Sequence, residues 1–184
     1  VDTDRLGPEG GLFAWDWTAP GEANWQAVAA FVAQRHRFAV ISGGPGTGKT
    51  YTIVRLMLRL VEAALAGGDP PPVFRLAAPT GKAAARMIAS VRDGLAALQP
   101  GEEVRRHLPD AAATLHRLLR LGRGSTRPGH DRDRPIPADV VIVDEASMVD
   151  LPMMAKLADA VADDARLILL GDRYQLASVE SGAV

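Results

Sequence analysis

The sequence of 184 residues contains no cysteine, which excludes disulfide bonds and thiolate metal sites. It also lacks any apolar run near the length of about 20 residues that a membrane-spanning helix requires. The opening residues are acidic at positions 2 and 4, and no apolar core of a signal peptide follows them. These absences favour a cytoplasmic protein with no membrane partner.

Lysine is scarce, and the positive charge is nearly all arginine. The only lysines are Lys49, Lys82 and Lys156. The net charge is −1, so composition alone gives no sign of a nucleic-acid partner. Apolar residues make up 47% and charged residues 23%, which is typical of a globular domain with a sizeable core. The chain begins with valine and stops after an apparent loop, so we expect a piece of a longer protein.

Short apolar runs alternate with segments of helical periodicity. The runs at 38–41, 73–78, 140–143 and 166–170 are rich in β-branched or other apolar residues and predict buried strands. Helices are expected at 24–34, 81–97, 111–121 and 151–162. A further helix is expected after the glycine-rich turn, with an apolar stripe from Ile53 to Ala64, and residues 67–70 should end it. This alternation predicts an α/β fold with a mostly parallel sheet flanked by helices.

Two regions are expected to lie outside the regular elements. Residues 1–22 are rich in Gly, Pro and Trp and read as a lead-in, which leaves 23–184 as the domain. Residues 122–138 combine Gly, Pro, His and several arginines, and we expect this loop to be mobile and solvated. In the first helix, Trp25, Val28, Ala29 and Val32 are expected to form the apolar face.

A glycine-rich turn follows the first expected strand and precedes a helix. Residues 43–50 read GGPGTGKT, which fits the phosphate-binding pattern G-x-x-x-x-G-K-[ST] in its required context. Glycines allow backbone N–H groups to converge on phosphate, and the helix N-terminus adds partial positive charge. Lys49 could reach the β- and γ-phosphates, and Thr50 could place its hydroxyl on Mg²⁺. The turn therefore predicts binding of ATP with Mg²⁺.

Two acids end the strand expected at 140–143. A carboxylate at the carboxyl end of a buried parallel strand lies on the ligand side of such a sheet. Asp144 could hold the Mg²⁺, directly or through water, and Glu145 could orient and deprotonate an attacking water. A pair of adjacent acids fits a hydrolase better than a kinase. Glu145 also argues against a pure nucleotide switch, although an interaction module switched by ATP stays open as an alternative.

Further motifs give the chain a family resemblance. Residues 78–86, 144–147 and 171–176, together with the glycine turn, resemble the nucleotide and DNA motifs of superfamily 1 helicases. Residues 24–26, 114–119, 148–154 and 176–184 narrow the resemblance to the RecD family, that of the alpha subunit of exodeoxyribonuclease V. The resemblance covers about residues 20 to 184. It implies a RecA-like P-loop NTPase domain, with the 166–170 strand between the 38–41 and 140–143 strands.

The resemblance also implies a function and partners. RecD is a 5′-to-3′ DNA motor with two RecA-like motor domains, and this chain corresponds to the first. Its expected partners are single-stranded DNA and homologues of RecB and RecC; a stand-alone RecD-like helicase is the alternative. The resemblance assigns the nuclease of the complex to RecB, so we predict none here. The second motor domain would supply an arginine that completes the ATP site. No arginine of this chain lies in a matching motif, so the piece alone should hydrolyse ATP poorly.

Site residues follow by position. The expected catalytic residues are Lys49, Glu145 and Gln175, and the expected metal ligands are Thr50 and Asp144. Gln26 matches a glutamine that reads the adenine edge, and Gln175 one that senses the γ-phosphate. The nucleotide is expected to contact Gln26, Gly43, Gly44, Pro45, Gly46, Thr47, Gly48, Lys49 and Thr50. The DNA backbone is expected to contact Thr80, Gly81, Lys82, Thr114 and His116, although the threonines could simply cap helices. The stretch 148–154 is expected to pack in the core.

Overall fold

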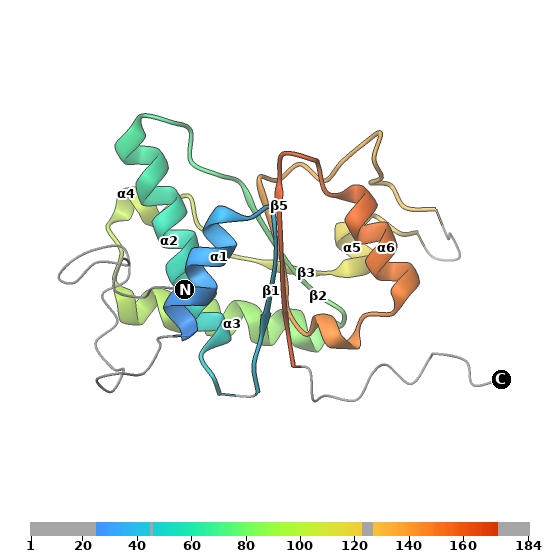
Figure 1. Cartoon of the computed structure of the whole chain (residues 1–184), viewed down its shortest axis with the longest axis horizontal. Helices are drawn as coiled ribbons and strands as arrows, with labels where there is room; N and C mark the ends of the chain where they lie inside the picture. The colour runs from blue at the N-terminus through green and yellow to red at the C-terminus, as the bar shows by residue number, and fades with distance from the viewer. Residues whose placement is uncertain (1–24, 45, 123–126, 173–184) are drawn as a thin grey trace.

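A parallel sheet forms the centre of the computed structural model, which describes residues 25–44, 46–122 and 127–172 (Figure 1). The five strands are β1 (Phe38–Ser42), β2 (Phe74–Ala78), β3 (Ala112–Thr114), β4 (Val140–Val143) and β5 (Arg166–Gly171). Their order is β1-β5-β4-β2-β3, and every pair of neighbours is parallel. The 166–170 strand is β5, and its expected position between β1 and β4 is confirmed.

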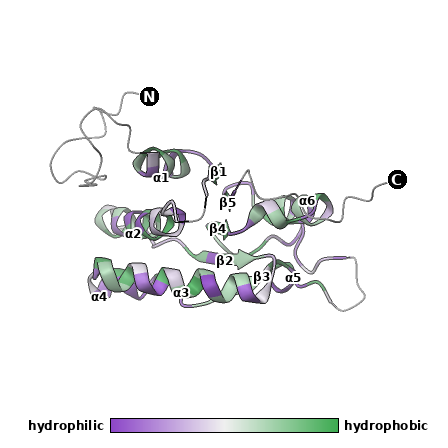
Figure 2. Ribbon diagram, turned by 90° about the horizontal axis from the view of Figure 1, so that it is seen from below, coloured by the Kyte–Doolittle hydropathy of each residue, from purple (hydrophilic) through white to green (hydrophobic). Residues whose placement is uncertain are grey.

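Helices cover the two faces of this sheet (Figure 2). On one side lie α1 (Trp25–Arg35), α2 (Lys49–Gly67), α3 (Gly81–Leu98) and the short α4 (Glu102–Arg105). On the other side lie α5 (Leu115–Leu118) and α6 (Leu151–Ala160). Within the described ranges, none of these helices is both long enough and apolar enough to cross a bilayer. The layering is that of the α/β fold expected from the sequence.

Alternate strand residues build a separate core on each face. Ile142, Ile168 and Leu170 are fully buried on the side of α2 and α3. Val141, Val143 and Leu167 pack on the side of α5 and α6. Because both faces of the central strands are covered, β4 is a continuous apolar run rather than an alternating one.

The helix expected at 111–121 is wrong. Ala112–Thr114 instead form strand β3, which pairs with β2, and only Leu115–Leu118 are helical. Thr114 has an extended backbone, and its hydroxyl oxygen accepts a hydrogen bond from the Arg117 N–H at 3.3 Å. Alanine has high helix propensity, but pairing with the sheet edge overrides it here. The connection between α3 and β3 contains the short helix α4.

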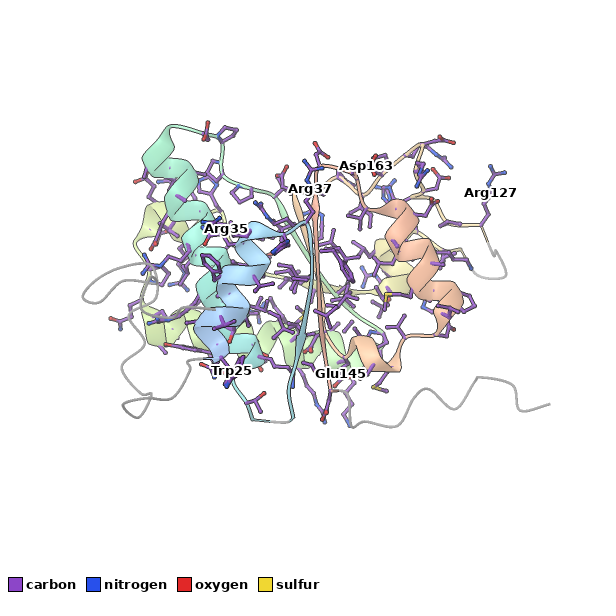
Figure 3. All side chains as sticks on the ribbon, in the orientation of Figure 1. Trp25, Arg35, Arg37, Arg127, Glu145 and Asp163 are labelled. Atoms are coloured by element: carbon purple, nitrogen blue, oxygen red, sulfur yellow. The ribbon has the colours of Figure 1, made fainter. Side chains whose placement is uncertain are left out.

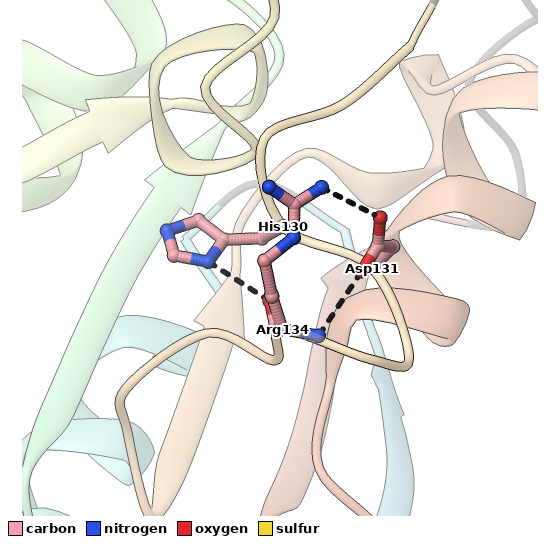
Figure 4. A network of polar contacts seen from close by, with 3 residues as sticks. All are labelled: His130, Asp131 and Arg134. Atoms are coloured by element: carbon pink, nitrogen blue, oxygen red, sulfur yellow. Dashed lines mark hydrogen bonds and ion pairs between the residues drawn. The ribbon is translucent and has the colours of Figure 1, made fainter.

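The segment after residue 126 is folded, contrary to expectation. The side chain of Ile136 is 2% exposed and packs in the α6-side core. Asp131 and Arg134 form an isolated antiparallel bridge, and the ring Nδ1 of His130 lies 3.1 Å from the Arg134 carbonyl oxygen (Figure 4). Residues 123–126 lie outside the described residues. A few apolar and polar contacts therefore order a stretch whose composition suggested a solvated loop.

The apolar face expected for α1 is wrong, and the core packing expected for residues 148–154 is confirmed only in part. In α1 the buried residues are Ala27, Ala30 and Ala33, whereas the Trp25 side chain is 75% exposed. The helix therefore packs on α2 through small residues rather than through its large ones. In the 148–154 stretch, Met148 is 45% and Leu151 81% exposed, and only Val149, Met153 and Met154 are partly buried against the core. Asp150 instead caps α6, accepting from the Met153 N–H at 2.7 Å.

Candidate functional site

The glycine turn joins β1 to α2 at the carboxyl edge of the sheet. Gly46 and Gly48 have φ of 76° and 78°, a left-handed backbone that other residues adopt at a cost. The hydroxyl of Thr47 donates to the Gly44 carbonyl at 2.9 Å, which closes the turn on itself. The Gly43 N–H donates to the Gly171 carbonyl at 3.1 Å and fixes the turn to β5. Pro45 lies outside the described residues.

Lys49 begins α2, and its ammonium folds back over the turn. The Nζ atom donates to the carbonyl of Gly43 and, at 2.9 Å, to that of Gly44. These contacts keep the positive charge beside the N–H groups that open α2. Thr52, one turn further on, is buried and donates from its hydroxyl to the Gly48 carbonyl at 3.0 Å. Hydrogen bonds from Thr47, Lys49 and Thr52 thus hold the turn, and they keep the Lys49 ammonium beside it.

The acid pair follows β4 with a sharp change of backbone direction. The Asp144 N–H continues the sheet by donating to the Ala77 carbonyl at 2.9 Å, and its carboxylate accepts from the Glu145 N–H at 2.8 Å. Glu145 has φ of 52°, a left-handed conformation that costs a non-glycine residue about 1–2 kcal/mol. Such strain concentrates at functional sites. Glu145 lies at the carboxyl end of the sheet, whereas Arg37 and Asp163 lie at the opposite end (Figure 3).

The turn and the acid pair open into one cavity of about 500 Å³. Its lining comes from the turn and the start of α2, from α3, and from the ends of β4 and β5: Gly46, Thr47, Gly48, Lys49, Thr50, Tyr51, Arg86, Ser90, Asp144, Glu145, Gly171 and Asp172. The structure therefore brings Lys49, Thr50 and the two acids together. Gln175, the other expected catalytic residue, lies outside the described residues.

The cavity suits a nucleoside triphosphate with Mg²⁺. Building a Cβ at Gly46, which lines the cavity, meets no atom within 4 Å, so there is open space beside the turn at this point. A hydroxyl at Thr50 and a carboxylate at Asp144 are the oxygen donors that Mg²⁺ prefers. Among the described residues, no cluster of three or more His, Asp or Glu could hold a metal ion. Phosphate oxygens would have to complete its coordination.

Gln26 supports the turn from α1. Its Nε2 donates to the Thr47 carbonyl at 2.7 Å, and a Cβ at Gly48 would lie 2.4 Å from the same nitrogen. Its Oε1 is buried and has no hydrogen-bond partner among the described residues. The amide nitrogen therefore has a structural partner, and contact of Gln26 with adenine stays a prediction.

The expected DNA-side residues lie next to one another. Thr80 follows β2, and Thr114 is the last residue of the neighbouring strand β3, where it pairs with Ala78. The Thr80 hydroxyl oxygen accepts from the Ala83 N–H at 3.1 Å and so caps α3, as Thr114 caps α5. Gly81, Lys82 and His116 are exposed. The capping roles are therefore real, and contact with DNA stays a prediction.

The cavity also contains residues that the sequence did not predict there: Tyr51, Arg86, Ser90, Gly171 and Asp172. Arg86 and Ser90 come from α3, one and two helical turns beyond Lys82. The spacing of 82, 86 and 90 is the signal that could have grouped them. Which neighbour that face meets depends on how α3 packs, and the sequence alone does not give this.

Comparisons with known proteins agree with this geometry. The family model described as an AAA domain matches residues 25–181. The chain is 51% identical over 160 residues to the RecBCD enzyme subunit RecD of Mycobacterium tuberculosis, covering 86% of this chain and 27% of that protein. It is 46% identical over 167 residues to the subunit of the same name from Haemophilus influenzae, covering 89% of this chain and 26% of that protein.

Two more distant matches extend the comparison. The ATP-dependent RecD2 DNA helicase of Deinococcus radiodurans is 37% identical over 173 residues, covering 91% of this chain and 20% of that protein. A solved structure of two coordinating Pif1 helicases unwinding forked double-stranded DNA matches with a TM-score of 0.54 and 18% identity. It covers 86% of this chain and 35% of that chain, and at this identity it shows the fold alone.

The chain spans about a quarter of the length of the RecD subunits that it matches. The resemblance to RecD seen in the motifs is confirmed by these identities, and the sheet has the RecA-like P-loop architecture that the resemblance implied. Since the AAA domain model matches nearly the whole described range, the chain belongs to the AAA domain family.

Proposed function

We propose that the longer protein containing this chain is an ATP-dependent DNA helicase of the RecD type. The chain would be its first motor domain, which couples ATP hydrolysis to 5′-to-3′ movement along single-stranded DNA. The observation that carries the proposal is the single cavity shared by Lys49, Thr50, Asp144 and Glu145. The names of the relatives, RecD subunits and a RecD2 DNA helicase, support the same activity.

The chain's own residues divide the work on ATP. The turn of residues 43–48 binds phosphate oxygens through backbone N–H groups, and Lys49 neutralises charge on the β- and γ-phosphates. Thr50 and Asp144 would hold Mg²⁺, and the bound ion would neutralise part of the charge of the triphosphate. Glu145 takes a proton from the attacking water, and its strained backbone orients the carboxylate for that step.

The DNA contacts belong to the same edge of the sheet. The N-termini of α3 and α5 present Thr80, Gly81, Lys82 and Thr114 beside each other, with His116 exposed nearby. N–H groups at a helix start and a lysine ammonium are suited to a phosphate backbone. Helix α3 carries both Lys82 and the cavity residues Arg86 and Ser90. A shift of this helix on binding DNA would therefore also move side chains of the nucleotide cavity.

We further infer that RecB and RecC homologues are partners in a heterotrimer. The RecD subunits of Haemophilus influenzae and Mycobacterium tuberculosis, at 46% and 51% identity, are more similar to this chain than the RecD2 helicase is at 37%. Tagged full-length protein purified from its native cell should therefore bring down both homologues. A protein that purifies alone and still unwinds 5′-tailed DNA would favour the stand-alone alternative.

Substitution of Lys49 tests the proposed activity. In the full-length protein, Lys49→Ala should abolish DNA-stimulated ATP hydrolysis and unwinding of a 5′-tailed duplex, because the phosphate charge is no longer neutralised. Lys156→Ala is the matched control, since this lysine lies on α6 and does not line the cavity. A Lys49→Ala protein that hydrolyses ATP at the wild-type rate would refute the assignment, and unwinding of 3′-tailed duplexes instead would refute the polarity.

A further inference from the structure

Helix α3 contributes Arg86 to the cavity, although the roles assigned above in binding and hydrolysing ATP use none of the side chains of this helix. The helix starts at the Thr80 cap and packs tightly on α2, since a Cβ at Gly94 would lie 3.1 Å from Cγ2 of Val54. Ala83, Met87 and Val91 are buried along its inner side. Arg86 is therefore carried by a firmly packed helix, and not by a loop.

The charges in the cavity leave the Arg86 guanidinium available. Lys49 donates to the carbonyls of Gly43 and Gly44. In contrast, no hydrogen bond or ion pair engages Arg86 within the described part of the chain, and its side chain is exposed. A guanidinium carries five N–H donors in one plane, which suits two oxygens of a single phosphate. The cavity thus holds an uncommitted phosphate-binding group in addition to the lysine.

Arg86 comes from a different element than the groups proposed to bind the rest of the nucleotide. The turn of residues 43–48 and Lys49 come from the β1–α2 connection, whereas Arg86 comes from the helix after β2. It lines the cavity together with Asp144 and Glu145, the proposed metal ligand and base. In a hydrolase, those acids act where the terminal phosphate is cleaved.

We infer that Arg86 is a phosphate-binding residue of this site, and that it contacts the terminal phosphate of a bound nucleoside triphosphate. The inference rests on the proposed nucleotide site. A diphosphate lacks the group that Arg86 contacts, so this residue makes the site prefer a triphosphate. Lys82 lies one turn earlier on the same face of α3. One helix therefore connects the residue that contacts the terminal phosphate with a residue proposed to contact DNA.

Binding measurements on the full-length protein test the inference. A non-hydrolysable ATP analogue and ADP are titrated separately against wild type, Arg86→Gln, Arg86→Lys and Arg92→Gln. Arg86→Gln should weaken binding of the analogue about 10- to 100-fold, as expected for a hydrogen bond to a charged group, and that of ADP less than about twofold. Arg86→Lys keeps the charge and loses the planar fork, so its loss should be smaller.

Arg92→Gln is the matched control on the same helix. Arg92 donates to the Asp110 carbonyl at 3.0 Å and does not line the cavity, so this variant should bind both ligands as wild type does. Unchanged analogue binding in Arg86→Gln, or an equal loss for analogue and ADP, would overturn the inference. If Arg86→Gln fails to fold, the analogue-to-ADP affinity ratio of Arg86→Lys decides in the same way.

Lys49→Ala separates this inference from the proposed function. Loss of both ligands in Lys49→Ala, with wild-type affinities in Arg86→Gln, would leave the nucleotide site standing and remove only the role of Arg86. Normal binding of both ligands in Lys49→Ala would remove the nucleotide site itself. Selective loss of the analogue in Arg86→Gln, together with loss of both ligands in Lys49→Ala, supports both.

Discussion

Gly48 has two separate physical reasons to be glycine. Its φ of 78° is left-handed, and a Cβ would lie 2.4 Å from Nε2 of Gln26. We expect Gly48→Ala to lower the free energy of unfolding by about 1–2 kcal/mol from the backbone alone, with a further loss as Gln26 is displaced. Urea unfolding of this chain measures the change.

Gly44 provides the control within the same turn. A Cβ there meets no atom within 4 Å, and its backbone is not left-handed. Gly44→Ala should therefore change the free energy of unfolding by less than about 0.5 kcal/mol. Equal destabilisation by the two substitutions would show that the geometry of Gly48 is not what matters.

Gln26 has two proposed roles, support of the glycine turn and recognition of adenine, and comparing ATP with GTP distinguishes them. Its Nε2 holds the Thr47 carbonyl, so Gln26→Ala should loosen the turn for every nucleotide. We expect affinity for ATP and GTP to fall by similar factors, about 3- to 10-fold, as for one lost hydrogen bond. Titration of the full-length variant with both nucleotides is the measurement. A loss confined to ATP would instead support adenine reading as its main role.

The sequence predicts those site residues that a short motif identifies by itself. The spacing of the glycines with Lys49 and Thr50, and the position of Asp144 after an apolar run, define these residues without a structure. Arg86 was not predictable in the same way, because its place in the cavity depends on how α3 packs against α2. The support that Gln26 gives to the turn depends likewise on the packing of α1. The role of a side chain that reaches the site from another helix can be assigned only when the packing of that helix is known.

At the scale of elements, apolar runs predicted the central strands and helix periodicity predicted α2 and α3. The failures lie where local preference and tertiary contact disagree. Residues 111–114 contain three alanines, which favour a helix, yet they complete the edge of the sheet as β3. The polar stretch after 126 is ordered by the buried Ile136 and by contacts between His130, Asp131 and Arg134.

The turn at Asp131 predicts a pH dependence of stability. Hydrogen bonding to the Arg134 side chain, together with its charge and N–H, holds the pKa of Asp131 below its ordinary value. A lowered pKa in the folded state means that the carboxylate stabilises the fold fully above the unfolded value of about 3.9. This contribution is lost as the pH falls through the folded pKa.

Thermal melts across pH measure this effect. Wild type should melt above Asp131→Asn near neutral pH, and the two melting temperatures should converge only as the pH falls through the lowered pKa of Asp131 in the folded state. Asp133→Asn changes the net charge equally at an exposed neighbour that makes no such contact with Arg134, so it controls for charge alone. A difference between wild type and Asp131→Asn that is constant with pH would contradict the assignment.

At the scale of the whole molecule, the two faces of the sheet are unequally covered. Among the described residues, α1, α2 and α3 cover one face of the sheet along its width, whereas α5 and α6 do not extend over the edge strand β1 on the other face (Figure 2). Phe38 and Val40 on that side are 58% and 60% exposed. Their partners in register, Leu167 and Leu169 on β5, are buried. The apolar surface of this layer therefore continues past the part that helices cover.

This asymmetry predicts different costs for two residues that share one face. Val40 and Leu169 are partners in adjacent strands, but only Leu169 is buried under the α6 layer. In this chain, Leu169→Ala should lower the free energy of unfolding by about 2–5 kcal/mol, because a cavity forms. Val40→Ala should cost less than about 0.5 kcal/mol, since its side chain loses little contact. Urea unfolding of both variants tests the difference, and comparable losses would mean that β1 is covered on both faces.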